Sequence, residues 1–216
     1  MTCARDCNGL LVEQFRRLAG ALHKGQTARG IRIVMVTSAM PSDGKTLTAI
    51  NLALALSGSY NRRVLLIDAD LRRPAIGEAL GLSKSAGLSE ALKSTSEEKL
   101  KLIPLTSTLT LLPAGRPDPD PLAGLTSLRM KRILQEAAGR FDWVIMDAPP
   151  VGLLPDANLM AGEVDGTLLV VRAERTQYPA IQNAVEVIGR DRLLGVVLNA
   201  VDHHAAAPYS YNYDTR

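Results

Sequence analysis

Hydrophobic residues along this chain occur in two patterns, short continuous runs and runs with a helical spacing. The helical spacing predicts helices over 10–23, after residue 44 (Leu47, Ile50, Leu54), near 130–138 and near 181–188. Continuous runs rich in β-branched residues and leucine predict strands over 33–38, 64–67, 109–112, 143–146, 167–171 and 194–198. Because apolar strands alternate with amphipathic helices, we expect a parallel sheet covered by helices on both faces.

The length and the connecting segments favour a single domain with two extensions. A chain of 216 residues suits one α/β domain with a sizeable core. Residues 25–30 are predicted to be a short polar connector, and the Pro-rich segment 113–121 is too short for a linker between domains. We therefore expect a helical arm over 1–30, the sheet domain over 31–202 and a flexible tail over 203–216.

The strongest chemical signal is AMPSDGKT at residues 39–46, between the first predicted strand and the helix that follows. It is a phosphate-binding loop (P-loop) with Ala39 in place of the first glycine, so the fold class is predicted to be a P-loop NTPase. Lys45 would contact the β- and γ-phosphates of ATP, and the Thr46 hydroxyl would ligate Mg²⁺. Backbone N–H groups and the helix dipole complete the predicted nucleotide site, which comprises Ala39, Pro41, Ser42, Asp43, Gly44, Lys45, Thr46 and Leu47.

Carboxylates follow two of the predicted strands. Asp68 and Asp70 come directly after 64–67, and Asp147 comes directly after 143–146. Ligands of open parallel sheets bind beyond the carboxyl ends of strands, and acids at i and i+2 point to the same side. We therefore expect Thr46, Asp68 and Asp147 to hold Mg²⁺ beside the nucleotide. The structural alternative is a turn in which Asp68 caps the next helix.

Three of the five tyrosines, Tyr209, Tyr211 and Tyr213, lie within five residues of one another near the C-terminus. In an extended strand, a spacing of two places their phenols on one side, ~6.6 Å apart. A phenol has a pKa near ~10, so phosphorylation needs a proton acceptor, and either Asp68 or Asp70 fits that role. We predict that these tyrosines are phosphoacceptors; a docking strand or an accident of composition is the alternative.

Composition argues against several kinds of partner. A formal charge of +3, without a basic run, does not indicate nucleic-acid binding, and the apolar stretches are shorter than the ~18–20 residues of a membrane span. Cys3 and Cys7 have no matching cluster of cysteine or histidine, as in a reducing compartment. We expect a cytoplasmic protein that does not insert into the membrane and whose association with it comes through a partner.

Together these motifs resemble the bacterial tyrosine kinases of capsule and exopolysaccharide assembly, which are relatives of the MinD/ParA partition ATPases. The resemblance implies ATP-dependent autophosphorylation of the tyrosine cluster by a kinase domain over 31–202, with Lys45, Asp68 and Asp70 as catalytic residues and Arg72 at the nucleotide. It also implies a homo-oligomer, a transmembrane chain-length regulator that activates the kinase, and a cognate tyrosine phosphatase. The resemblance rests on residues 37–46 (TSAMPSDGKT), 64–74 (VLLIDADLRRP), 111–121 (LLPAGRPDPDP), 141–152 (FDWVIMDAPPVG) and 164–176 (VDGTLLVVRAERT).

Two departures from the family pattern refine this interpretation. Met40 stands where the partition ATPases carry a signature lysine, which favours the kinase branch over a partition or positioning ATPase. In the arm, which the family uses for contacts between subunits or with the activator, Glu13 and Arg16 match E-x-x-R-x-x-R, but Ala19 replaces the second arginine. A catalytically silent nucleotide-binding partner of a transporter is a third possibility. Asn199 would contact adenine or form a strand-end turn.

Overall fold

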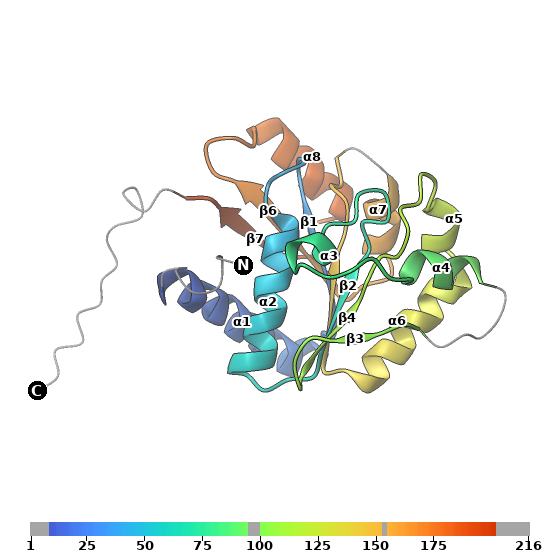
Figure 1. Ribbon diagram of the computed structural model, residues 1–216. Coiled ribbons are helices and arrows are strands. Elements are labelled where there is room, and N and C mark those ends of the chain that lie inside the picture. The colour runs from blue at the N-terminus through green and yellow to red at the C-terminus, as the bar shows by residue number, and fades with distance from the viewer. Residues whose placement is uncertain (1–8, 95–99, 153–154, 202–216) are drawn as a thin grey trace, which may run out of the picture.

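The computed structural model describes residues 9–94, 100–152 and 155–201 (Figure 1). Its helices are α1 (Gly9–Arg29), α2 (Lys45–Ser59), α3 (Ile76–Ala79), α4 (Leu88–Lys93), α5 (Leu122–Leu125), α6 (Leu128–Arg140), α7 (Pro155–Ala161) and α8 (Tyr178–Ile188). Its strands are β1 (Ile33–Ser38), β2 (Val64–Asp68), β3 (Ile103–Pro104), β4 (Leu109–Leu112), β5 (Trp143–Asp147), β6 (Gly166–Arg172) and β7 (Leu193–Asn199).

Within the described residues the strands form one seven-stranded sheet in the order β3-β4-β2-β5-β1-β6-β7. Every neighbouring pair is parallel except β3 and β4, which are antiparallel. The predicted α/β architecture is therefore confirmed, with one added edge strand. That strand has two residues, one of them Pro104, so it has no periodicity that a sequence pattern could reveal.

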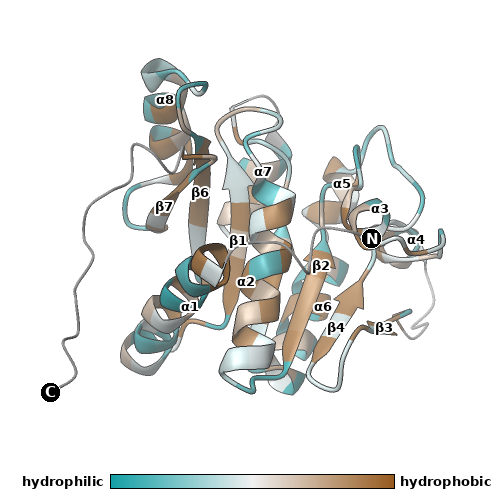
Figure 2. Cartoon of the chain, turned by 60° about the vertical axis from the view of Figure 1, so that its left-hand side comes forward, coloured by the Kyte–Doolittle hydropathy of each residue, from teal (hydrophilic) through white to brown (hydrophobic). Residues whose placement is uncertain are grey.

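Helices cover both faces of the sheet (Figure 2, in which the residues are coloured by hydropathy). On one face α1, α2 and α3 pack over alternate strand residues such as Val36, Leu66 and Ile145. On the other, α4 to α7 pack over the intervening residues such as Met35 and Ile67, and α8 packs over β6 beside α7. The central strands are buried on both faces, which explains their continuous apolar runs.

The first helix is longer at its C-terminal end than predicted. It continues to Arg29, so the expected polar connector over 25–30 is wrong. Tertiary contact explains the extension, because the Gln26 side chain donates a hydrogen bond of 2.8 Å to the backbone oxygen of Asp142. Of the apolar residues with helical spacing in this helix, Leu11 is exposed, whereas Ala19 and Leu22 are buried.

The helix predicted after residue 44 is confirmed as α2, but most of the apolar residues that indicated it lie outside its buried face. Leu47 and Leu54 are 56% and 45% exposed, and only Ile50 of that stripe is buried. The buried residues include Ala53 and Leu56, because α2 lies between the sheet and α1 and its small residues allow close approach on two sides.

Among the helices of the described chain, none is both long and apolar enough to cross a bilayer.

Candidate nucleotide and phosphotransfer site

The loop between β1 and α2 has the backbone shape of an anion-binding site. Ser42 and Gly44 have φ angles of 65° and 100°, in the left-handed region. Gly44 is the N-cap of α2, and no side chain caps the helix there. The first N–H groups of this 15-residue helix are therefore available to an anion, together with the positive end of its dipole.

The ends of β6 and β7 hold this loop in place. Asp43 is buried, and its carboxylate accepts hydrogen bonds from the Met40 N–H at 2.9 Å and the Thr176 hydroxyl at 2.8 Å. The Asn199 side chain donates to the backbone oxygen of Asp43 at 2.8 Å, and Arg172 donates to that of Ser42 at 3.3 Å. These hydrogen bonds hold Ser42 and Asp43 against the ends of β6 and β7.

The sequence indicated only some of the residues that hold the P-loop in place. Thr176 and Arg172 follow a predicted strand, but neither residue type marks a nucleotide site by itself. Asn199 was assigned to adenine or to a turn; here it packs against Gly44, where an added Cβ would lie 1.9 Å from its Nδ2 atom. The role of Asp43 at the nucleotide stays a prediction, since its carboxylate faces inward.

Lys45 lies among carboxylates from two strand ends. Its Nζ atom is 2.8 Å from Oδ2 of Asp70 and 3.5 Å from Oδ1 of Asp147, and the Thr46 hydroxyl donates to Oδ2 of Asp147 at 2.7 Å. Burial raises the pKa of Asp147 to about 6, although Lys45 and Thr46 oppose the shift. Burial would lower the pKa of Lys45, but Asp147 and Asp70 outweigh it and raise that pKa, so Lys45 stays charged.

Asp68 uses its two oxygens differently. Oδ2 accepts the backbone N–H groups of Ala75 and Ile76 at 3.1 and 3.0 Å, at the start of α3, as the capping alternative predicted. Oδ1 is buried and has no hydrogen-bond partner among the described residues. Burial and the charge of Asp147 raise the pKa of Asp68 to about 7. Asp68 therefore holds the start of α3 through Oδ2, while its Oδ1 atom accepts no hydrogen bond from the described residues.

Three carboxylates around one ammonium leave an excess of negative charge that a divalent cation would offset. Oxygen donors from Thr46, Asp147 and the free Oδ1 atom of Asp68 are of the kind that Mg²⁺ prefers. No group of three or more histidine, cysteine or acidic side chains forms a ready metal cage in the described part of the chain. This fits Mg²⁺, which usually binds through one or two carboxylates together with substrate phosphates.

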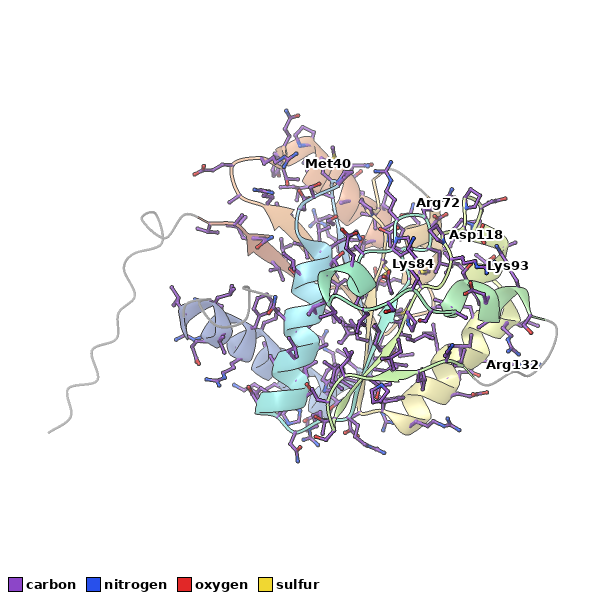
Figure 3. All side chains as sticks on the ribbon, in the orientation of Figure 1. Met40, Arg72, Lys84, Lys93, Asp118 and Arg132 are labelled. Atoms are coloured by element: carbon purple, nitrogen blue, oxygen red, sulfur yellow. The ribbon has the colours of Figure 1, made fainter. Side chains whose placement is uncertain are left out.

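Arg72 has a different partner from the one expected. Its guanidinium forms a two-point ion pair with the buried carboxylate of Asp156 on α7, with distances of 2.7 and 3.3 Å, and also donates to the backbone oxygen of Pro119. Beside it, Lys93 pairs with Asp118 at 2.7 Å (Figure 3). Arg72 thus fastens α7 and the Pro-rich loop to the segment after β2, and its contact with nucleotide stays a prediction. Asp156 was missed because nothing nearby in the sequence indicates its partner.

The structure brings together the P-loop, Lys45, Thr46, Asp68, Asp70 and Asp147 at the carboxyl ends of β1, β2 and β5. The Leu47 side chain, at the start of α2, is exposed. Tyr209, Tyr211 and Tyr213 lie outside the described residues, so their role stays a prediction.

Comparison with known proteins gives matches over most of the chain. The AAA domain family model matches residues 31–190. The tyrosine-protein kinase YwqD of Bacillus subtilis is 33% identical over 207 residues, covering 94% of this chain and 86% of the relative. The solved kinase domain of the Escherichia coli tyrosine kinase ETK superposes with a TM-score of 0.83 at 30% identity, covering 94% of this chain and 80% of that domain.

Some relatives are much longer than this chain. The tyrosine-protein kinase wzc of Salmonella typhimurium is 30% identical over 94% of this chain, which spans 29% of its length. The succinoglycan biosynthesis transport protein ExoP of Rhizobium meliloti is 30% identical over 92% of this chain, which spans 26% of its length. The matching segment therefore occurs both as most of a protein and as a part of larger ones.

Proposed function

The chain belongs to the bacterial tyrosine-protein kinases, and from this premise we propose that it transfers the γ-phosphoryl group of ATP to its own C-terminal tyrosines. One observation carries the proposal: the ammonium of Lys45 and three strand-end carboxylates converge beside the uncapped start of α2. Phosphoryl transfer needs this combination, because catalysis consists of positioning the phosphates and stabilising their charge.

Each group has a part in binding the nucleotide. The phosphates of ATP would lie on the P-loop N–H groups, with Lys45 at the β- and γ-phosphates. Thr46 and Asp147 would hold Mg²⁺, which neutralises charge on the phosphates, and the free oxygen of Asp68 is left for the proton transfer. Asp70 keeps Lys45 in place, since their ion pair is 2.8 Å long and both side chains are largely buried.

The transfer step uses Asp68 as the base. The phenol oxygen of tyrosine forms a bond to the γ-phosphorus, and the bond from that phosphorus to the β–γ bridging oxygen breaks, which releases ADP. The phenol proton passes to Asp68. Two observations favour Asp68 over Asp70: its Oδ1 atom is unpartnered, and its pKa of about 7 lies near the operating pH of a general base.

The proposal extends to the cellular setting of the kinase. The similarity to ExoP, a succinoglycan biosynthesis transport protein, supports a role in exopolysaccharide or capsule synthesis or export. We propose that a transmembrane chain-length regulator recruits this kinase to the inner face of the membrane and activates it, that it forms a homo-oligomer, and that a tyrosine phosphatase reverses the reaction. Exposed Leu10, Leu11 and Val12 at the start of α1 suit a protein contact by the arm.

The test is direct phosphosite analysis. Full-length protein is incubated with ATP, Mg²⁺ and the cytoplasmic segment of the activator, and phosphate on Tyr209, Tyr211 and Tyr213 is located by mass spectrometry. Lys45→Met should remove the signal, and Lys101→Met, an exposed position outside the site and the arm, should keep it. ATP turnover to free phosphate with no phosphate on these tyrosines would refute the proposal and favour a partition-type ATPase.

A further inference from the structure

Two segments carry the acids of the phosphate site, one after β2 and one after β5. The sheet fixes where these strands end, because Asp68 lies opposite Asp147 and the N–H of Ala69 donates to the backbone oxygen of Asp147 at 2.8 Å. Asp70 comes after this bond and lies outside the strand. The position of its carboxylate therefore depends on what holds the loop over 70–73.

Asp70 divides its two oxygens between this loop and Lys45. Its Oδ1 atom accepts the backbone N–H of Arg73 at 3.1 Å, and its Oδ2 atom is 2.8 Å from Nζ of Lys45. The side chain of Asp70 is 7% exposed and that of Lys45 is 12% exposed, so little water is available to replace this contact. A shift of the loop would move the carboxylate that holds the ammonium of Lys45.

Arg72 ties the same loop to α7 (Figure 3 labels Arg72). Its Nε and Nη2 atoms donate to Oδ2 and Oδ1 of Asp156 at 2.7 and 3.3 Å, and its Nη1 atom donates to the backbone oxygen of Pro119. A two-point contact fixes the orientation of the guanidinium as well as its distance. Asp156 is fully buried, so loss of Arg72 would leave a buried charge uncompensated, and this favours a permanently formed pair.

The helix that carries Asp156 also supports the P-loop. The next residue, Ala157, is buried in the same apolar cluster as Ala39, the first residue of the P-loop. Met160 and Ala161, further along α7, are buried in the neighbouring cluster on the same face of the sheet. These contacts give Asp156 a defined position relative to the start of the P-loop.

We propose that Asp156 is a positioning residue of the kinase, which acts through Arg72 on Asp70 and thereby sets the ammonium of Lys45 for the phosphates. The proposal rests on the proposed function, since phosphoryl transfer is what uses the position of Lys45. The contacts that link Asp156 to Lys45 are present without nucleotide, so this link can be tested separately. Asp156→Asn is the informative change, because asparagine has the same shape but lacks the charge and one of the two acceptor oxygens.

The first experiment measures the reactivity of Lys45 in the ligand-free, full-length protein. Lysines are acetylated with a limiting amount of acetic anhydride, and mass spectrometry gives the labelling of Lys45 relative to the exposed Lys101. The ion pair with Asp70 should slow the reaction of Lys45. Asp156→Asn should therefore raise the ratio by ~2- to 5-fold, the size expected when one such ion pair is weakened.

The neighbouring ion pair provides a matched control. Lys93 pairs with Asp118 at 2.7 Å, and Asp118 belongs to the same Pro-rich loop as Pro119 (Figure 3). Lys93→Met removes that pair and leaves the contact between Arg72 and Asp156 in place. It should not change the labelling ratio of Lys45.

The second experiment measures phosphotransfer under the conditions of the phosphosite test. At saturating ATP, Asp156→Asn should lower the rate of tyrosine phosphorylation by ~10-fold, as a small displacement of a reacting group does, and should change ATP affinity by no more than about twofold. In an Asp70→Asn background the same change should have little further effect, because its influence passes through Asp70. Independent, multiplying losses would overturn the proposal.

The labelling outcomes separate the two proposals. If Asp156→Asn keeps its far-ultraviolet circular dichroism and Lys45 labels as in the native protein, the positioning role is overturned, whatever the kinase activity. An equal rise at Lys45 and Lys101 means general loosening and also overturns it. Should Asp156→Asn fail to fold, Arg72→Lys breaks the two-point contact from the other side and is held to the same criterion. Raised labelling of Lys45 without phosphate on any tyrosine overturns the proposed function and supports the link from Asp156 to Lys45.

Discussion

Replacing Asp68 with asparagine should stabilise the ligand-free protein at pH 8. Asp68 is buried near Asp147, and its pKa is raised from 3.8 to about 7 by burial and by that neighbour. At pH 8 the folded protein therefore keeps a buried negative charge that the unfolded chain holds in water. Asparagine removes the charge, and its side-chain oxygen can still accept the N–H groups of Ala75 and Ile76.

The sign and the size of the effect come from proton linkage. Because the folded-state pKa is raised, the folded protein binds more protons than the unfolded chain between pH 4 and 7, so stability falls as pH rises through that window. A shift of about three pKa units corresponds to ~4 kcal/mol at 1.36 kcal/mol per unit. Local relaxation screens part of this, so ~2 kcal/mol is expected, or an increase in Tm of ~5 °C.

Thermal unfolding followed by circular dichroism at pH 8 and pH 5 tests this reasoning, without nucleotide or Mg²⁺. The gain from Asp68→Asn should be largest at pH 8 and shrink at pH 5, where Asp68 is protonated. Asp142→Asn is the matched control with the opposite sign: burial opposes the shift, but hydrogen bonds from Arg63 outweigh it and lower the pKa of Asp142. A loss of stability in Asp68→Asn at pH 8, or equal gains at both pH values, would refute the argument.

Three further variants test the site. Lys45→Met should abolish phosphotransfer and retain the fold, as measured by phosphosite analysis and circular dichroism; loss of secondary structure would contradict its placement facing ligand. Arg72→Lys, which replaces the two-point contact with Asp156, should lower the free energy of unfolding in urea by ~2 kcal/mol and leave ATP affinity within twofold. A tenfold loss of ATP affinity at unchanged stability would instead support a nucleotide contact. Gly44→Ala should cost ~1–3 kcal/mol and weaken ATP binding, because its φ is 100° and Asn199 occupies the Cβ position; unchanged affinity for a fluorescent ATP analogue would contradict this.

The features that could be predicted from the sequence depend on residues close together along the chain. The central strands, the P-loop and the acids after β2 and β5 are of this kind, because an apolar run determines a strand and its end determines where the next side chain lies. Asp68, Asp70 and Asp147 could therefore be assigned to one edge from local patterns and a single rule about parallel sheets. The comparisons confirm the family that these motifs indicated.

The features that could not be predicted depend on contacts between distant segments. The extension of α1 to Arg29 is supported by Gln26 and Asp142, and the pairing of Arg72 with Asp156 joins residues 84 positions apart. In α2 the leucine pattern indicated one face, but burial is decided by packing between the sheet and α1. Helical spacing alone does not say how many neighbours a helix has.

Asp68 links the two halves of the proposed reaction. Its Oδ2 atom accepts the backbone N–H groups at the start of α3, while its Oδ1 atom is buried without a hydrogen-bond partner among the described residues. The position of the proposed base therefore depends on the hydrogen bonds at the start of α3. A substitution at the start of α3 should then lower the rate of tyrosine phosphorylation at saturating ATP more than it weakens ATP binding, since it moves the base and leaves Lys45 and the P-loop in place.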